Sequence, residues 1–308
     1  VLAAFGGLAI FGIGVSSAVS EINPVIPSPS PTATPAPTPT PGFATAVLTF
    51  GSRGTGPAHF EDARSIAVDG KGNIYVGEYG SGRIQAFNSQ GEFITQWTGD
   101  EEYPLRDLAA DRQGVVYVAQ KGKIWRFDGA TGQPLSPAFE TDYWLDALAV
   151  TPSGELLVVQ ESNPAFKTLV RFTSAGQATQ TIDQPLPVEK SRPASSIEKV
   201  TVDGRGRILV LGRNKDAVYR LSAAGEFLDR FGSDGDAPGS LTAPADIAVD
   251  GRGRIYISDF GGVLVFSPEG SYLATIDVDG PADGLVFNDR DELFVVAREK
   301  VVKYTLNK

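Results

Sequence analysis

One pattern recurs six times along this chain and constrains its fold more than any other feature. Each copy has an apolar stretch, a tight turn and a second apolar stretch, as in IAVDGKGNIYV over residues 66–76 and IAVDGRGRIYI over 247–257. The turns recur at intervals of about 40 to 50 residues, which is typical of one propeller blade per repeat. Because such a repeat can bury its apolar faces only against its neighbours, the pattern predicts a ring of blades. The turn residues are Asp69, Asp111, Thr151, Asp203, Asp250 and Asn288.

The predicted fold class is all-β, with a six-bladed β-propeller over residues 44–308. The 35 glycines and 21 prolines supply many turns, and no repeat shows a sustained helical period. Each repeat would supply a four-stranded blade, but the last one ends near residue 306 without an outer strand. We expect residues 44–50, ATAVLTF, to complete this blade and close the ring, because closure removes the open sheet edge.

The first 43 residues have a different composition. Residues 1–20 carry no charged side chain, and a stretch of about 20 apolar residues is long enough for a transmembrane α-helix. The alternative is a cleaved signal peptide with Ser16 and Ala18 near the cleavage site. Residues 21–43 are rich in Pro and Thr and predict an extended linker. We therefore expect a single-pass protein of the cell membrane, with residues 1–20 in the lipid bilayer and the propeller on the extracytoplasmic side.

Composition excludes several classes of function. The formal net charge of −10 repels polyphosphate and argues against a nucleic-acid partner. The chain has no cysteine, which excludes disulfides and thiolate metal sites. Its single histidine, His59, leaves little room for zinc or histidine-based hydrolase chemistry. We expect no cofactor, no metal and no enzymatic activity.

Two of the repeats resemble NHL repeats. They are RSIAVDGKGNIYVGEYGSGRIQAFNSQGEF over residues 64–93 and PADIAVDGRGRIYISDFGGVLVF over 244–266. The resemblance extends over residues 44–308 and implies a six-bladed propeller that serves mainly as a binding platform. The predicted arrangement of a membrane helix, a linker and an external propeller is similar to the sensor regions of some bacterial receptor kinases. The family also includes a peptide-amidating lyase with metal-binding histidines, and this chain lacks the histidines for that activity.

Two candidate sites lie on one face of the predicted propeller, where the loops lead into the inner strands; we call it the top face. Aromatic side chains of its loops are expected to contact a protein partner, namely Tyr79, Tyr103, Tyr143, Trp144 and Phe260. A polar ring is expected at the mouth of the central channel. It could bind a cation or a polar ligand, but we expect its charges to neutralise one another. Its residues are Arg64, Arg106, Asp107, Asp146, Glu198, Lys199, Asp246 and Asp283.

These features together predict a membrane-anchored extracytoplasmic propeller that acts as a protein-binding scaffold. It would be an accessory subunit of a membrane protein complex, and its partners would be other subunits or envelope proteins. One alternative is the ligand-sensing ectodomain of a bacterial receptor whose cytoplasmic part precedes Val1. A further alternative is a calcium-dependent propeller lactonase or lyase. Sugar-lactonase propellers hold calcium with central carboxylates and amides, and the ring here contains no Asn.

Overall fold

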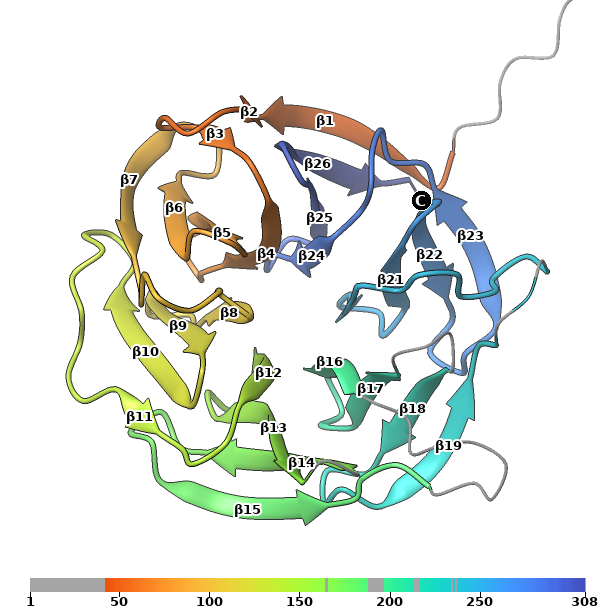
Figure 1. Cartoon of the computed structure of the whole chain (residues 1–308). Helices are drawn as coiled ribbons and strands as arrows, with labels where there is room; N and C mark the ends of the chain where they lie inside the picture. Colours follow the sequence, from red (N-terminus) through yellow and green to blue (C-terminus); the bar gives the residue numbers. More distant parts are fainter. Residues whose placement is uncertain are drawn as a thin grey trace, which may run out of the picture. The chain divides into compact units, whose positions relative to one another are not determined.

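The protein is seen in a computed structural model that describes residues 42–307 except 164–165, 188–196, 213–216, 234 and 236. Within these residues all regular structure is β-strand. The strands form six four-stranded sheets and one two-stranded pair. Figure 1 shows the six sheets side by side around a common centre, each with one edge strand toward the centre. The predicted all-β six-bladed propeller is therefore confirmed.

The blades follow one another in chain order. Blade 1 contains β4 (Ala63–Val68), β5 (Ile74–Glu78), β6 (Arg83–Phe87) and β7 (Phe93–Thr98). Blade 2 contains β8 (Asp107–Ala110), β9 (Val115–Gln120), β10 (Lys123–Asp128) and β11 (Phe139–Glu140). Blade 3 contains β12 (Leu145–Val150), β13 (Leu156–Asn163), β14 (Phe166–Phe172) and β15 (Ala178–Asp183).

The second half of the ring repeats this order. Blade 4 contains β16 (Ile197–Val202), β17 (Ile208–Gly212), β18 (Val218–Leu221) and β19 (Phe227–Phe231). Blade 5 contains β20 (Asp246–Val249), β21 (Ile255–Asp259), β22 (Gly262–Phe266) and β23 (Tyr272–Ile276). Blade 6 contains β24 (Gly284–Phe287), β25 (Glu292–Ala297), β26 (Lys300–Leu306) and, from the start of the propeller, β1 (Ala44–Phe50). The two-stranded pair is β2 (Ser52–Arg53) and β3 (His59–Phe60).

The ring closes through strands from the two ends of the propeller. Strand β1 pairs antiparallel with β26, from Ala44 opposite Leu306 to Phe50 opposite Val301, and Figure 1 shows it on the outside of blade 6. Residues 44–50 thus supply the outer strand that this blade lacks. The inner strands also contact one another in a closed cycle, in the order β4, β8, β12, β16, β20, β24 and back to β4.

The hydrophobic core is divided among the six interfaces between neighbouring blades. Each interface has its own buried cluster. Ile66 of blade 1 packs in the cluster shared with blade 6, and the next residue, Ala67, packs in the cluster shared with blade 2. This alternation arises because successive side chains of a strand point to opposite faces of the sheet. It explains why the inner and second strands are apolar on both faces in the sequence.

The Asp-Gly turns that mark the repeats have one shared geometry. In blade 5, Asp250 Oδ1 accepts hydrogen bonds from the backbone N–H groups of Arg252 and Arg254 at 3.0 and 2.8 Å. Its Oδ2 accepts one from the Tyr256 hydroxyl at 3.0 Å. Gly253 has a φ of +81°, a conformation that glycine adopts without strain. The turn carboxylate therefore ties the turn to the second strand, which accounts for the recurring Asp.

The N-terminal predictions fall almost entirely outside the described residues. The expected transmembrane helix over residues 1–20 lies outside them, and so does the linker over 21–43 except for its last two residues. Within the described ranges, no helix has the length and apolar character needed to cross a bilayer.

Candidate functional site

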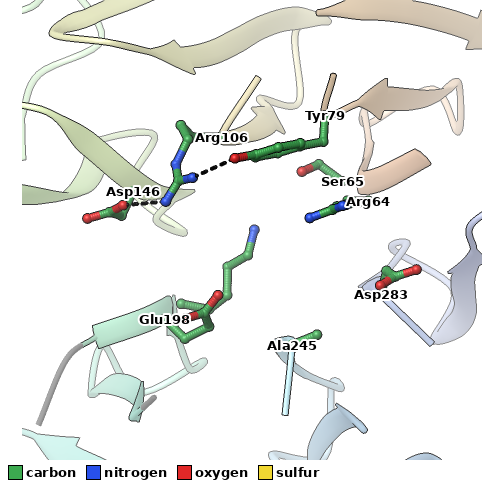
Figure 2. Close-up of a pocket in the computed structure, with 9 residues that line it drawn as sticks. Arg64, Ser65, Tyr79, Arg106, Asp146, Glu198, Ala245 and Asp283 are labelled. Atoms are coloured by element: carbon green, nitrogen blue, oxygen red, sulfur yellow. Dashed lines mark hydrogen bonds and ion pairs between the residues drawn. The ribbon is translucent and has the colours of Figure 1, made fainter. Parts of the chain in front are cut away.

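A pocket of about 210 Å³ opens at the centre of the top face. Figure 2 shows its labelled side chains around a shared space, with the ribbons that carry them arranged about it. Five of the six blades contribute charged or hydroxyl side chains to the lining, and blade 5 contributes an alanine. The lining residues are Arg64, Ser65, Tyr79, Arg106, Asp146, Glu198, Lys199, Ala245 and Asp283.

The repeat explains why these side chains converge. One position of each repeat lies two residues before the inner-strand apolar run. We call these six residues the mouth ring, Arg64, Arg106, Asp146, Glu198, Ala245 and Asp283. The following position gives a second set, the inner ring, Ser65, Asp107, Ala147, Lys199, Asp246 and Gly284. Because each blade places its inner strand at the centre, residues that lie about 40 to 50 positions apart meet in one ring.

Blades 2 and 3 are linked by a charged cluster in the mouth ring. The guanidinium of Arg106 donates to Asp146 Oδ1 at 2.7 Å and to the Tyr79 hydroxyl at 3.1 Å, and Figure 2 draws both bonds. The Lys167 ammonium binds the other oxygen of Asp146. Burial disfavours the charged carboxylate, but the hydrogen bonds from Lys167 and Arg106 hold the pKa of Asp146 below its usual value. Asp146 therefore stays ionised beside the pocket.

On the side of the pocket formed by blades 1 and 6, the charged side chains use fewer of their hydrogen-bonding atoms in ion pairs. Arg64 donates from Nε and Nη2 to Asp62 at 2.9 and 2.8 Å, and its guanidinium carbon lies 4.3 Å from the centre of the Tyr79 ring. Asp283 accepts from Arg298 Nε at 3.2 Å. Burial raises the pKa of Asp283 above its usual value, although Arg298 and Arg64 act in the opposite direction. Asp283 is therefore a carboxylate of the pocket lining with a raised pKa.

The inner ring holds a buried ion cluster. Asp107 accepts from the Lys199 ammonium at 2.6 Å and from the backbone N–H of Leu148 in the next blade at 3.0 Å. Asp246 accepts from the N–H of Leu285 in the next blade at 2.9 Å. The pKa of Asp246 is raised to about 6, because burial and the nearby Asp107 carboxylate raise it more than Lys199 lowers it. Asp107 and Asp246 thus join neighbouring blades, and they are not among the residues that line the pocket.

The predicted aromatic contact residues do not form one patch. Tyr79 lines the central pocket between Arg64 and Arg106. Tyr103 and Trp144 meet edge to face with ring centres 6.3 Å apart, and Trp144 is 49% exposed. Tyr143 beside it is 43% exposed, whereas Phe260, in the turn between β21 and β22 of blade 5, is 77% exposed. The structure therefore separates a pocket tyrosine from exposed aromatics on blades 3 and 5.

Ser65 and Ala245 line the pocket, at positions that the repeat places at the mouth of the central channel. Sequence reasoning missed two other residues that shape the site. Lys167 and Arg298 hold the ring carboxylates, but they come from β14 and from the turn after β25, where no repeat signal marks them. His59 is not among the lining residues, and its Nδ1 lies 2.8 Å from the Pro57 carbonyl oxygen.

A divalent cation, as the calcium-dependent alternative requires, does not fit the pocket residues. Among the described residues, no three or more His, Cys, Asp and Glu side chains form a group that could hold a metal ion. The pocket lining also brings in the positive groups of Arg64, Arg106 and Lys199. Calcium prefers six or more oxygen ligands, and the Asp146 and Asp283 carboxylates are each bound to a cationic side chain.

Comparisons with known proteins agree on the architecture. A protein-family model described as a 6-bladed beta-propeller matches residues 185–305. A search of the curated proteins finds none that matches this sequence. Among solved structures, a gluconolactonase from Xanthomonas campestris has a TM-score of 0.62 at 15% identity, over 85% of this chain and 99% of that one. The virginiamycin B lyase of Staphylococcus aureus has 0.59 at 12% identity, over 84% and 99%.

The same comparison also finds a WD40 propeller domain, with a TM-score of 0.59 at 12% identity, over 86% of this chain and 98% of that one. At such identities these likenesses show the propeller fold alone. They do not confirm the more specific predictions, which are the NHL-repeat type and the membrane-anchored type. What the comparisons establish is that the chain folds as a six-bladed β-propeller.

One prediction from the sequence is wrong. We expected no enzymatic activity, because one histidine and no cysteine remove the commonest hydrolase and metal chemistry. Gluconolactonase and the lyase are enzymes with a similar propeller fold, so the fold and the residue counts give no ground for that exclusion. The physical reason is that carboxylate, guanidinium and phenol groups converge on the pocket. Such groups support acid–base and electrostatic catalysis without His or Cys.

Proposed function

We propose that the central pocket binds a small hydroxylated carboxylic acid or its lactone, and that opening of such a lactone by water is the reaction to which the site is suited. The observation that carries this proposal is the convergence of Arg64, Tyr79, Arg106 and Asp283 on one pocket at the ring centre. The lining holds cationic donors, anionic acceptors and a phenol in fixed positions. These groups match a ligand with hydroxyl groups and one acidic or ester group. The gluconolactonase among the similar folds supports the same ligand class.

Arg64 is the residue best placed to hold the ligand's carbonyl or carboxylate oxygen. Its bonds to Asp62 use Nε and Nη2, so Nη1 is the group that would donate to a ligand. The Tyr79 ring against its guanidinium restricts the side chain to one orientation. A positive group held in place in this way stabilises the negative charge that develops on a carbonyl oxygen under attack.

Asp283 is the candidate general base. It lies on the same side of the pocket as Arg64 in Figure 2, and burial raises its pKa, which makes it a stronger base than an exposed carboxylate. Asp283 would take a proton from a water molecule while the water oxygen bonds to the lactone carbonyl carbon. The ring C–O bond then breaks, and the ring oxygen takes the proton from Asp283. One water is consumed and one hydroxy acid is released.

The test uses binding and turnover together. We expect gluconate to bind by isothermal titration calorimetry, and Arg64→Met to weaken its binding at least about tenfold because a charge-assisted hydrogen bond is lost. Asp283→Asn should bind as the wild type does but hydrolyse glucono-δ-lactone about 100-fold more slowly in a pH-stat assay. Arg205→Met, at an exposed turn between β16 and β17, is the matched control. If no hydroxy acid or lactone binds, the proposal fails.

A second candidate function is docking of a protein to the top face, with the propeller anchored outside the cytoplasm by its N-terminal segment. The exposure of Trp144 and Phe260 favours it, because exposed aromatic side chains are frequent anchors in protein interfaces. The apolar residues 1–20 support the anchoring. The test is detergent solubilisation of cells, followed by identification of proteins that co-purify with the wild type and not with Trp144→Ala. Equal co-purification by both would contradict it.

A further inference from the structure

The lysine of the inner ring is surrounded by acidic groups. Lys199 follows Glu198 in β16, and its ammonium donates to Asp107 Oδ1 at 2.6 Å. The carboxylates of Asp107, Asp246 and Glu198 all stabilise its positive charge. The side chain is only 12% exposed. One compact cation therefore donates to a carboxylate of blade 2 and is stabilised by the charges of two more, from blades 4 and 5.

The carboxylates are held in place by the backbone and not by the lysine alone. Asp107 accepts the N–H groups of Leu108 and Leu148 at 3.0 Å each. Asp246 accepts those of Ile247 and Leu285 at 2.8 and 2.9 Å. Each aspartate thus bonds its own inner strand and that of the next blade. Because these bonds build the ring, the two carboxyl groups remain near the centre whether or not a lysine is present.

Two buried carboxylates that face a shared cation repel each other when the cation is removed, and leaving a charge unpaired in the interior costs several kcal/mol. In a protein, such a cluster is neutralised by protonation, by a metal ion or by a side-chain cation. A lysine ammonium is a compact point charge with three donors, which suits a site beside several carboxylates. Here the Lys199 ammonium occupies that place.

We infer that Lys199 is the internal cation that neutralises the carboxylates of the inner ring, and that the central pocket binds its ligand without a divalent cation. The first part stands on the geometry of the inner ring alone. The second part rests on the proposed function, because it concerns the hydroxylated acid or lactone.

The experiment compares the wild type with two variants of one residue. Lys199→Ala removes the cation and leaves room for another, whereas Lys199→Met removes the charge and keeps the space filled. Both should melt about 5 to 15 °C below the wild type, as expected for loss of one partner of a buried pair. Added methylammonium chloride should raise the melting temperature of Lys199→Ala and leave Lys199→Met unchanged, whereas calcium chloride should stabilise neither variant. The wild type should respond to neither calcium nor EDTA.

Several results would overturn the inference. A wild type that calcium stabilises or EDTA destabilises would show that a metal, and not Lys199, neutralises the ring. A Lys199→Ala protein that responds to methylammonium no more than Lys199→Met does would show that the carboxylates form no cation site. If Lys199→Ala fails to fold, calorimetric titration of the wild type with calcium decides, because measurable binding contradicts the inference.

A last measurement separates this inference from the proposed function. Gluconate binding by the wild type is measured before and after treatment with EDTA. An unchanged Kd supports metal-independent binding. Loss of binding after chelation overturns the second part of the inference and leaves the proposed function intact. Absence of gluconate, lactone or related hydroxy-acid binding in both conditions contradicts the proposed function, and the melting experiments on Lys199 still stand.

Discussion

Replacement of a single turn carboxylate should weaken the propeller by an amount that can be worked out from its contacts. The Asp250 side chain is fully buried. Its Oδ1 accepts two backbone N–H groups, and its Oδ2 accepts the Tyr256 hydroxyl at 3.0 Å and Arg254 Nε at 2.6 Å. Asp250→Ala removes all four bonds. The Tyr256 hydroxyl is left buried without this acceptor, whereas the turn N–H groups and Arg254 can reach water.

The expected loss follows from these two classes of group. A buried hydroxyl without a partner costs about 1–3 kcal/mol, and each turn N–H group that exchanges its acceptor for water loses about 0.5–1 kcal/mol. The total is about 2–5 kcal/mol, so the urea midpoint should fall clearly. Tyr256→Phe removes only the hydroxyl bond and should cost about 1 kcal/mol. Because both changes remove the same bond, the double variant should cost less than the sum of the single ones.

The measurement is urea unfolding followed by tryptophan fluorescence, with all variants at one pH. Asp289→Ala is the matched control, since Asp289 lies in the equivalent turn of blade 6 with a side chain that is 55% exposed. Its midpoint should equal that of the wild type. If Asp250→Ala unfolds within about 0.5 kcal/mol of the wild type, a range typical of surface substitutions, the buried turn carboxylate does not hold the turn to the second strand.

Two further predictions concern the inner ring and the closure. The pKa of Asp246 lies near 6 in the folded state, above the usual value near 4, so wild-type stability from this group is lost as pH rises from about 4 to 6. The free energy of unfolding of Asp246→Asn relative to the wild type should therefore rise over that range by about 2–3 kcal/mol; a flat difference in urea titrations would contradict it. Deletion of residues 1–50 removes β1 and leaves β26 unpaired, so the melting temperature should fall and the protein should aggregate in size-exclusion chromatography. Deletion of residues 1–41 is the control and should leave melting unchanged; equal melting of both would show that β1 does not stabilise the ring.

The repeat made a large part of the site predictable. Arg106 and Asp283 occupy equivalent positions in repeats 2 and 6, and a ring of blades must bring such positions together. The partners of these residues were not predictable. Lys167 reaches Asp146 from β14, and Arg298 reaches Asp283 from the turn after β25. Both contacts depend on how far a hairpin extends over the top face, which no repeat signal encodes.

The chain's own sequence determined the number of blades, the turn carboxylates and the set of residues at the ring centre, because each depends on local periodicity that recurs in every repeat. Only the tertiary structure decided which of those charges face the pocket and which are buried in bonds between blades. Lys199 and Asp107 lie 92 positions apart in the chain, and their ion pair forms because two inner strands meet at the centre. Such contacts follow from the curvature of the whole ring, and therefore the chemistry of the pocket is a property of the closed propeller.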